Sequence, residues 1–96
     1  MSRIEFHPAA NFDAHEAVMW YQKRSRRAAG GFERALSNAI KRISADPMSF
    51  PLLDGVHRFC ILKKYPYYVV FRLIADAIIV VAVAPTHRAD YWHERE

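Results

Sequence analysis

Basic side chains gather in one stretch of the sequence that contains no acid to balance them. Between positions 56 and 75 the cations are Arg58, Lys63, Lys64 and Arg72. An arginine guanidinium offers a planar fork to two phosphate oxygens, and a lysine ammonium offers a point charge. Such groups stabilise the negative charge on the oxygens of the phosphorane that forms during RNA cleavage, and they equally suit an acidic protein. We therefore expect this stretch to face a polyanion or an acidic partner.

Cleavage of RNA also requires groups that move protons. His57 and His87 are the candidates for a base, because an unperturbed imidazole titrates near neutral pH. They lie far apart in the sequence and follow no spacing typical of metal ligands. The other histidines and the single cysteine, Cys60, are scattered as well, so the sequence predicts no metal site and no cofactor. We interpret Cys60 as a small core residue on a strand.

The aromatic residues near the end of the sequence allow two interpretations. Tyr91 and Trp92 follow the last predicted strand. Such rings stack on the bases of single-stranded nucleic acid, or they cover a core with the polar end in water. We expect Trp92 to cover the core, and for Tyr91 both interpretations stay open.

Arg72 interrupts a strand that is otherwise apolar and aromatic. Strand alternation places it on the same face as Tyr68. Burying an unpaired guanidinium is costly, so Arg72 either forms an ion pair within the chain or faces a partner. The candidates for the internal pair are Asp76 and Glu5.

Size and composition predict one globular domain spanning residues 1–96. The chain is 52% apolar with a net charge of +4, which suits a single core and excludes a disordered chain. The longest apolar run is far below the roughly 18 residues of a membrane helix, and we see no signal-peptide pattern. A lone cysteine suits a reducing compartment. We therefore expect a cytoplasmic protein without membrane contacts, and we interpret the basic run 23–27 as a solvated turn.

Hydrophobic periodicity predicts an α+β domain with the element order β-α-α-β-β-β. Alternation at 3–7 indicates a short strand, and Pro8 suits the first turn of a helix that runs to about Arg24. We expect Gly30-Gly31 to break this helix. A second amphipathic helix follows from Phe32 and ends at Asp46-Pro47. After a loop, the sequence predicts three strands at 57–63, 67–74 and 77–84.

The short connections between these elements predict their arrangement. Two amphipathic helices joined by a short turn form an antiparallel hairpin, and strands joined by two tight turns form an antiparallel meander. We expect the helical hairpin to pack on one face of an antiparallel sheet. The strand at 78–84 is apolar at every position, so we expect it to be central. The other face would be partly open and lined by basic residues.

Five motifs in this order resemble the RelE/ParE superfamily of bacterial toxins, of the plasmid-stabilisation type. The motifs are Phe6-His7-Pro8-Ala9-Ala10, Ala17-Val18-x-Trp20-Tyr21, Asp46-Pro47-x-x-Phe50-Pro51, Lys64-Tyr65-Pro66-Tyr67-x-Val69-x-Phe71-Arg72 and His87-Arg88-x-x-x-Trp92. The resemblance implies a helical hairpin on an antiparallel sheet. It also implies the toxin of a type II toxin–antitoxin module, which causes growth arrest and is neutralised in a protein complex with a cognate antitoxin. RelE-like members cut mRNA on the ribosome, whereas ParE-like members inhibit DNA gyrase.

The resemblance also suggests site residues. If the chain is a ribosome-dependent endonuclease, Arg88 together with Lys63 or Lys64 would hold the scissile phosphate, and Tyr91 or His87 would move protons. The strand position at which RelE-like members carry a further catalytic arginine falls here at or near a tyrosine. Contacts to a partner or nucleic acid are expected from a second set, namely Arg58, Arg72, Tyr68 and Trp92.

Three functional hypotheses follow from the sequence. The first is a toxin that acts on gyrase or translation, with a lean towards a member that is not a nuclease. The second is the mRNA endonuclease itself. The third is a nontoxic binding module that keeps the same fold.

Overall fold

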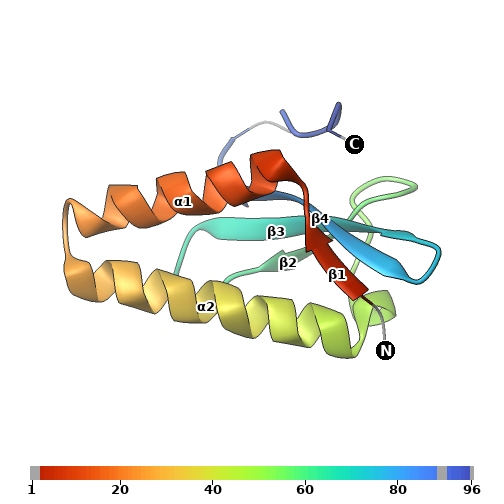
Figure 1. The fold of residues 1–96 in the computed structure, drawn as a ribbon, viewed down its shortest axis with the longest axis horizontal. Helices are drawn as coiled ribbons and strands as arrows, with labels where there is room; N and C mark the ends of the chain where they lie inside the picture. Colours follow the sequence, from red (N-terminus) through yellow and green to blue (C-terminus); the bar gives the residue numbers. More distant parts are fainter. Residues whose placement is uncertain (1–2, 89–90, 96) are drawn as a thin grey trace.

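The computed structural model describes residues 3–88 and 91–95 and confirms the predicted α+β class and element order. The elements are β1 (Arg3–Phe6), α1 (Pro8–Gln22), α2 (Arg26–Ala45), the short 3-10 helix η1 (Pro47–Ser49), β2 (Arg58–Ile61), β3 (Tyr67–Ile74) and β4 (Ala77–Pro85). Figure 1 shows the two helices as a hairpin beside the sheet. None of the described helices is both long enough and apolar enough to span a membrane.

The sheet is mixed, which corrects the expectation of an antiparallel sheet. Its strand order is β1-β4-β3-β2, and only the pairs β2–β3 and β3–β4 are antiparallel. β1 pairs in parallel with β4, the last strand along the chain, although both helices and two strands separate them in sequence. β4 is central, as predicted, and it lies between β1 and β3.

The turn between the helices also differs from the prediction. α2 begins at Arg26, so Gly30 and Gly31 lie inside α2 and do not form the boundary between the two helices. The start is set by Ser25, whose hydroxyl accepts a hydrogen bond from the backbone N–H of Ala28 at 3.1 Å. Gly31 is needed where it stands, because a Cβ atom there would collide with the hydroxyl group of Tyr65.

Each face of the sheet carries its own apolar cluster. The larger cluster lies under the helices and includes Phe32, Ile43, Val69, Phe71, Ile78, Val80 and Val83. The smaller one lies on the opposite face and consists of Val70, Val81, Ala82, Ala84 and Trp92. Trp92 is only 2% exposed, so it covers this second core as expected.

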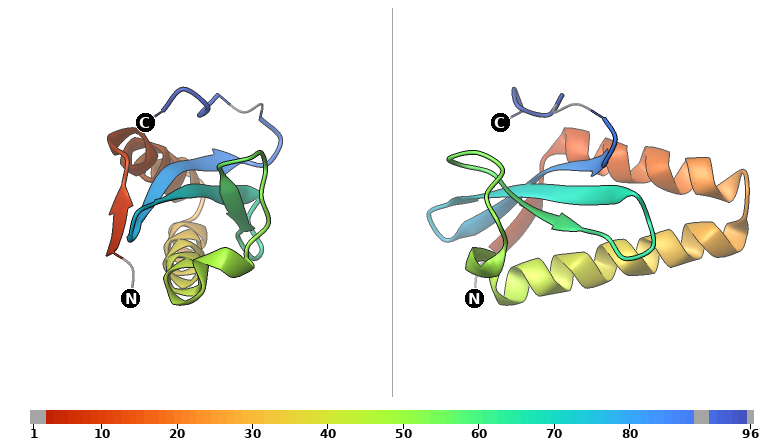
Figure 2. Two further views of the ribbon diagram at one scale, coloured as in Figure 1. Left: turned by 90° about the vertical axis from the view of Figure 1, so that its right-hand side faces the viewer. Right: turned by 180° about the vertical axis from the view of Figure 1, so that it is seen from behind.

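The second face is therefore less open than predicted. In Figure 2, left, the C-terminal segment lies above the sheet and α2 lies below it. A register shift between Val70 and Phe71 lets Val81 and Ala82 both face the second core. This irregularity explains how β4 buries apolar side chains against both layers.

Candidate functional site

A cavity of about 360 Å³ lies between α1, the end of β4 and the C-terminal segment Tyr91–Arg95. Its lining mixes exposed aromatic rings with charges of both signs. The residues are Phe12, Asp13, Glu16, Ala17, Trp20, Tyr67, Val83, Pro85, Arg88, Tyr91 and Arg95. Arg88 and Tyr91, two of the predicted catalytic residues, thus share one cavity. We call it the tail cavity.

An ion pair between α1 and the C-terminal segment forms the base of the tail cavity. The Arg95 guanidinium donates to both carboxylate oxygens of Asp13, at 2.6 and 3.2 Å. Both side chains are largely buried. The hydrogen bonds to Asp13 raise the pKa of Arg95, although burial acts in the opposite direction. Arg95 therefore stays charged, and its hydrogen bonds to Asp13 hold the segment Tyr91–Arg95 against α1.

The side chains of Asp13 and Arg95 also form hydrogen bonds with the backbone of β4, beyond the point where β1 ends. The last contact from the β1 side is the His7 backbone N–H, which donates to the Val80 carbonyl at 2.8 Å. Beyond that point Arg95 donates to the Val81 carbonyl, and the Val83 N–H donates to Asp13, both at 3.1 Å. Asp13 and Arg95 thus satisfy backbone groups that a longer β1 would have paired.

Tyr91 lies beside two cations in the tail cavity. The guanidinium carbons of Arg88 and Arg95 lie 4.5 and 5.1 Å from the centre of its ring. Burial, followed by the nearby Asp13 carboxylate, raises the pKa of Tyr91. The phenol is therefore protonated at neutral pH and suits hydrogen-bond donation or proton delivery more than the work of a base.

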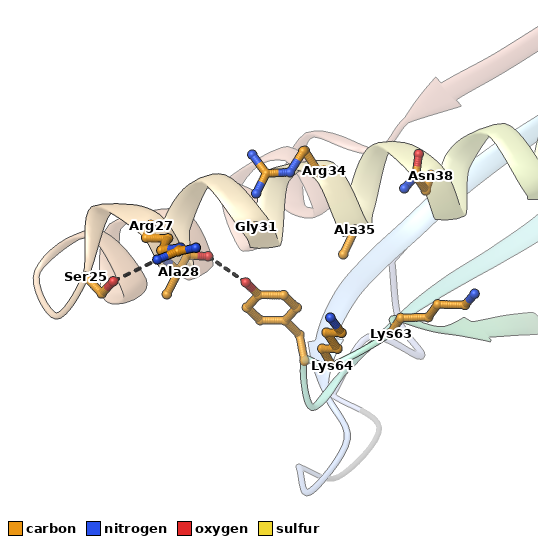
Figure 3. Close-up of a pocket in the computed structure, with 10 residues that line it drawn as sticks. Ser25, Arg27, Ala28, Gly31, Arg34, Ala35, Asn38, Lys63 and Lys64 are labelled. Atoms are coloured by element: carbon orange, nitrogen blue, oxygen red, sulfur yellow. Dashed lines mark hydrogen bonds between the residues drawn. The ribbon is translucent and has the colours of Figure 1, made fainter.

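A second cavity, of about 480 Å³, lies between α2 and the connection from β2 to β3. Four exposed cations line it, and Figure 3 shows them around the groove: Arg27, Arg34, Lys63 and Lys64. No carboxylate lines this cavity, and within residues 3–88 and 91–95 none of the four cations has an ion pair. We call it the basic groove.

Tyr65 holds the wall of the basic groove in place. Its hydroxyl donates to the backbone carbonyl of Ala28 on α2 at 2.9 Å. Its ring meets the rings of Tyr21 and Phe32 edge to face, with centroids 5.1 and 5.6 Å away. Lys64, next to it, adopts a left-handed backbone with a φ of 70°. The basic groove thus combines a firmly packed wall with exposed charged side chains, which suits an anionic partner.

The set proposed for RNA cleavage is divided between these two cavities. Lys63 and Lys64 line the basic groove, whereas Arg88 and Tyr91 line the tail cavity, and the described lining residues have no member in common. His87 is exposed in the turn after β4 and lines neither cavity. Neither of these two cavities therefore brings the predicted lysines together with Arg88 and the predicted proton-transfer residues.

The four residues expected to contact a partner occupy different environments. Arg58 donates to the Phe50 carbonyl at 2.6 Å and so holds the loop before β2. Arg72 is half-buried, and its Nε has no hydrogen-bond partner among the described residues. The ring of Tyr68 lies 6.0 Å from that of a neighbouring phenylalanine, and Trp92 is buried. The predicted pairs of Arg72 with Asp76 and Glu5 are not formed in the part of the chain described.

Sequence reasoning missed Asp13 and Arg95. The two residues are 82 positions apart, and neither stands in a motif. The available signal was an acid on a helix that is otherwise rich in apolar residues, which needs a partner when it faces the sheet.

Comparison with known proteins finds a solved structure with a similar fold. No protein-family model and no curated protein sequence matches the chain. Among solved structures, a chain of the chromosomal ParDE TA system from P. aeruginosa superposes with a TM-score of 0.80 at 14% sequence identity. The match covers 91% of this chain and 98% of that chain. At this level of identity the likeness shows the fold, and it confirms the predicted RelE/ParE-like architecture.

Proposed function

We propose that the chain is the toxin component of a type II toxin–antitoxin module, acting in the cytoplasm and neutralised by a cognate antitoxin. The supporting observation is the superposition over nearly the whole length of both chains with a component of a ParDE toxin–antitoxin system. Fold alone does not determine function. The surfaces of this chain therefore have to supply the remaining support.

An exposed apolar strip on α1 suits the antitoxin. Phe12, Met19 and Trp20 are 63%, 39% and 50% exposed, and their spacing places them on one face of the helix. The Arg24 guanidinium lies 3.6 Å from the centre of the Trp20 ring, which gives the strip a basic end. An amphipathic segment with some acidic residues matches this surface. We expect apolar burial to supply most of the affinity, because exposed ion pairs contribute little.

The division of the cations favours inhibition of gyrase over RNA cleavage. An endonuclease has to place its phosphate-binding groups and its proton-transfer groups around one phosphodiester. Here Lys63 and Lys64 line one cavity, and Arg88 and Tyr91 line another. We therefore propose that the toxin arrests growth by binding DNA gyrase, without cutting mRNA.

The second candidate is the ribosome-dependent mRNA endonuclease. One observation favours it: Arg88 and the protonated phenol of Tyr91 lie together in the tail cavity. A guanidinium beside a phenol is able to hold a phosphate and to protonate a leaving oxygen. This candidate requires that residues outside the tail cavity, or the ribosome, supply the remaining groups.

Induced expression in a bacterial host tests both candidates. We expect growth arrest with intact mRNA and altered plasmid supercoiling, and relief when the neighbouring antitoxin gene is expressed as well. Arrest with mRNA cut at A-site codons, lost in Arg88→Ala, would instead establish the endonuclease. Arg26→Ala is the matched control, because this arginine is exposed on α2 and lines neither cavity. Unimpaired growth on induction would leave only the nontoxic binding module.

A further inference from the structure

Two segments far apart in the sequence meet beside the second core. The loop between η1 and β2 contributes Asp54 and His57, and the C-terminal segment contributes His93. One ligand atom from each residue lies within 4.8 Å of the other two. Figures 1 and 2 show the loop and the C-terminal segment close together beside the sheet. We propose that Asp54, His57 and His93 form a binding site for a divalent transition-metal ion of the Zn²⁺ type.

The distances suit such an ion. Asp54 Oδ2 lies 3.0 Å from His57 Nδ1 and 3.7 Å from His93 Nδ1. Zinc bonds of about 2.0–2.2 Å to nitrogen and oxygen imply roughly 3.3 Å between ligand atoms in a tetrahedral site. The two distances from Asp54 Oδ2 lie on either side of this value, and the ligand atoms of the two histidines, which lie within 4.8 Å of each other, would move closer to share one ion.

Asp54 is held in the orientation that a ligand requires. Its Oδ1 accepts the backbone N–H groups of Val56 and His57 at 2.7 and 2.6 Å, which directs Oδ2 towards the imidazoles. The carboxylate is thus oriented before any ion binds, which reduces the cost of assembling the site.

His57 is held in place by burial and by a neighbouring aromatic ring. The residue is 8% exposed, and its ring lies 4.9 Å from the ring of Trp92, centre to centre. Its Nε2 is buried with no hydrogen-bond partner among the described residues. Among the described residues, the side-chain hydrogen bonds of this ring are made through Nδ1, which faces the carboxylate of Asp54.

The ligand set points to the class of ion. Imidazole nitrogen favours zinc, copper and nickel, whereas calcium and magnesium prefer sites made entirely of oxygen. Three protein ligands leave a fourth tetrahedral position for water or for a partner's side chain. The ion would join the loop at Asp54 to the segment that carries Trp92. Its expected effect is to hold the cover of the second core in place. This differs from the expectation of no metal site, because only folding brings the three residues together.

Metal titration of the purified full chain without an affinity tag tests the site. We expect a single equivalent of Zn²⁺ to bind after chelator treatment and to raise the melting temperature as its concentration rises. Co²⁺ should give the intense visible absorption of tetrahedral nitrogen and oxygen coordination. Ca²⁺ and Mg²⁺ should give neither effect. Because toxicity does not enter the measurement, its outcome is independent of the proposed function.

Variants decide whether these three residues bind the ion. Loss of a ligand in His93→Ala should weaken binding by at least the roughly 10- to 100-fold seen for outer-shell changes. Asp54→Asn should do the same, and it keeps an oxygen that accepts the two backbone N–H groups. His87→Ala is the matched control, since this histidine is exposed outside the cluster. Equal loss in all three variants, or no loss in His93→Ala, would overturn the proposal.

Discussion

The two faces of the sheet are covered by different means. On one face, two helices of 15 and 20 residues bury a large apolar cluster. On the other, a short C-terminal segment covers a small cluster through Trp92. The first cover is held by dispersed apolar contacts, whereas the second is fixed by the ion pair of Asp13 and Arg95 and the contacts of Asp54.

This difference suggests that the two covers open in different ways: one only on global unfolding, the other by local opening. Apolar burial spread over many residues produces a cooperative unit that opens only when the whole domain unfolds. A cover held by a few directional polar contacts opens locally at a lower cost. The tail cavity and the proposed metal site both lie on the locally held side. Ligand binding there would act on the position of the C-terminal segment, while the helical hairpin stays in place.

The largest loss of unfolding free energy is expected from Phe32→Ala, in the apolar cluster under the helices. Phe32 is fully buried, and its ring contacts those of Tyr65 and Tyr67 at 5.6 and 5.1 Å. We expect a loss of about 3–5 kcal/mol of unfolding free energy, from lost burial and the cavity left behind. Urea unfolding measures it.

Phe12→Ala serves as the control for this change. Phe12 is 63% exposed on α1, so its truncation should alter stability by less than about 0.5 kcal/mol. A similar loss in both variants would show that the helical hairpin is not the cooperative core. It would also remove the contrast between the two faces.

A smaller effect is expected from Asp13→Ala on the locally held side. It leaves the Arg95 guanidinium without its carboxylate and the Val83 N–H without its acceptor. Breaking a buried pair costs roughly 3–5 kcal/mol, and we expect about 2–3 because Arg95 keeps some contact with water. Hydrogen exchange should show fast opening at Val83 while the amides of α2 stay protected.

Two further variants sharpen this result. Glu16→Ala changes an exposed carboxylate of the same cavity and should leave the exchange pattern unaltered. Adding Arg95→Met to Asp13→Ala removes the stranded charge and should restore part of the stability. If α2 loses protection together with Val83 in Asp13→Ala, the two faces form one cooperative unit and the comparison fails.

The side under the helices could be predicted from local patterns in the sequence. The second helix was predicted from the apolar stripe that includes Phe32 and Ile43 and from its end at Asp46-Pro47. The central strand was predicted from the apolar run at 78–84. The start of α2 was predicted too late. Gly30 and Gly31 were interpreted as a break, but the helix begins before them, where the Ser25 hydroxyl accepts a hydrogen bond from the Ala28 N–H.

The other side depends on contacts between distant residues. The burial of Trp92 followed from its chemistry, but Asp13 and Arg95 are 82 positions apart and carry no local signal. The same applies to β1, which alternates as a strand should, while its parallel pairing depends on where β4 returns. Local periodicity reports which side chains are buried, and it does not report which distant element covers them.

The smallest effect is expected at alkaline pH, where tyrosines on the two sides should behave differently. Burial, and then the neighbouring Tyr67 and Tyr65, raise the pKa of Tyr21 beside the helical core. The raised pKa of Tyr91 has opposing influences, because Arg95 and Arg88 favour the phenolate. A raised pKa means that the unfolded chain loses the proton first. Stability is therefore complete below the ordinary tyrosine value of 10.0 and falls as the pH rises through the folded value.

We accordingly expect the unfolding free energy to be insensitive to tyrosine ionisation up to about pH 9 and to decline above about pH 10. Tyr21→Phe should remove more of this decline than Tyr91→Phe. The phenolate of Tyr21 has no cation among the causes of its shift, whereas that of Tyr91 lies beside two. Unfolding curves at several alkaline pH values measure the two slopes. If Tyr91→Phe flattened the decline more, the C-terminal segment would be packed as firmly as the helical side, contrary to the difference between the two covers.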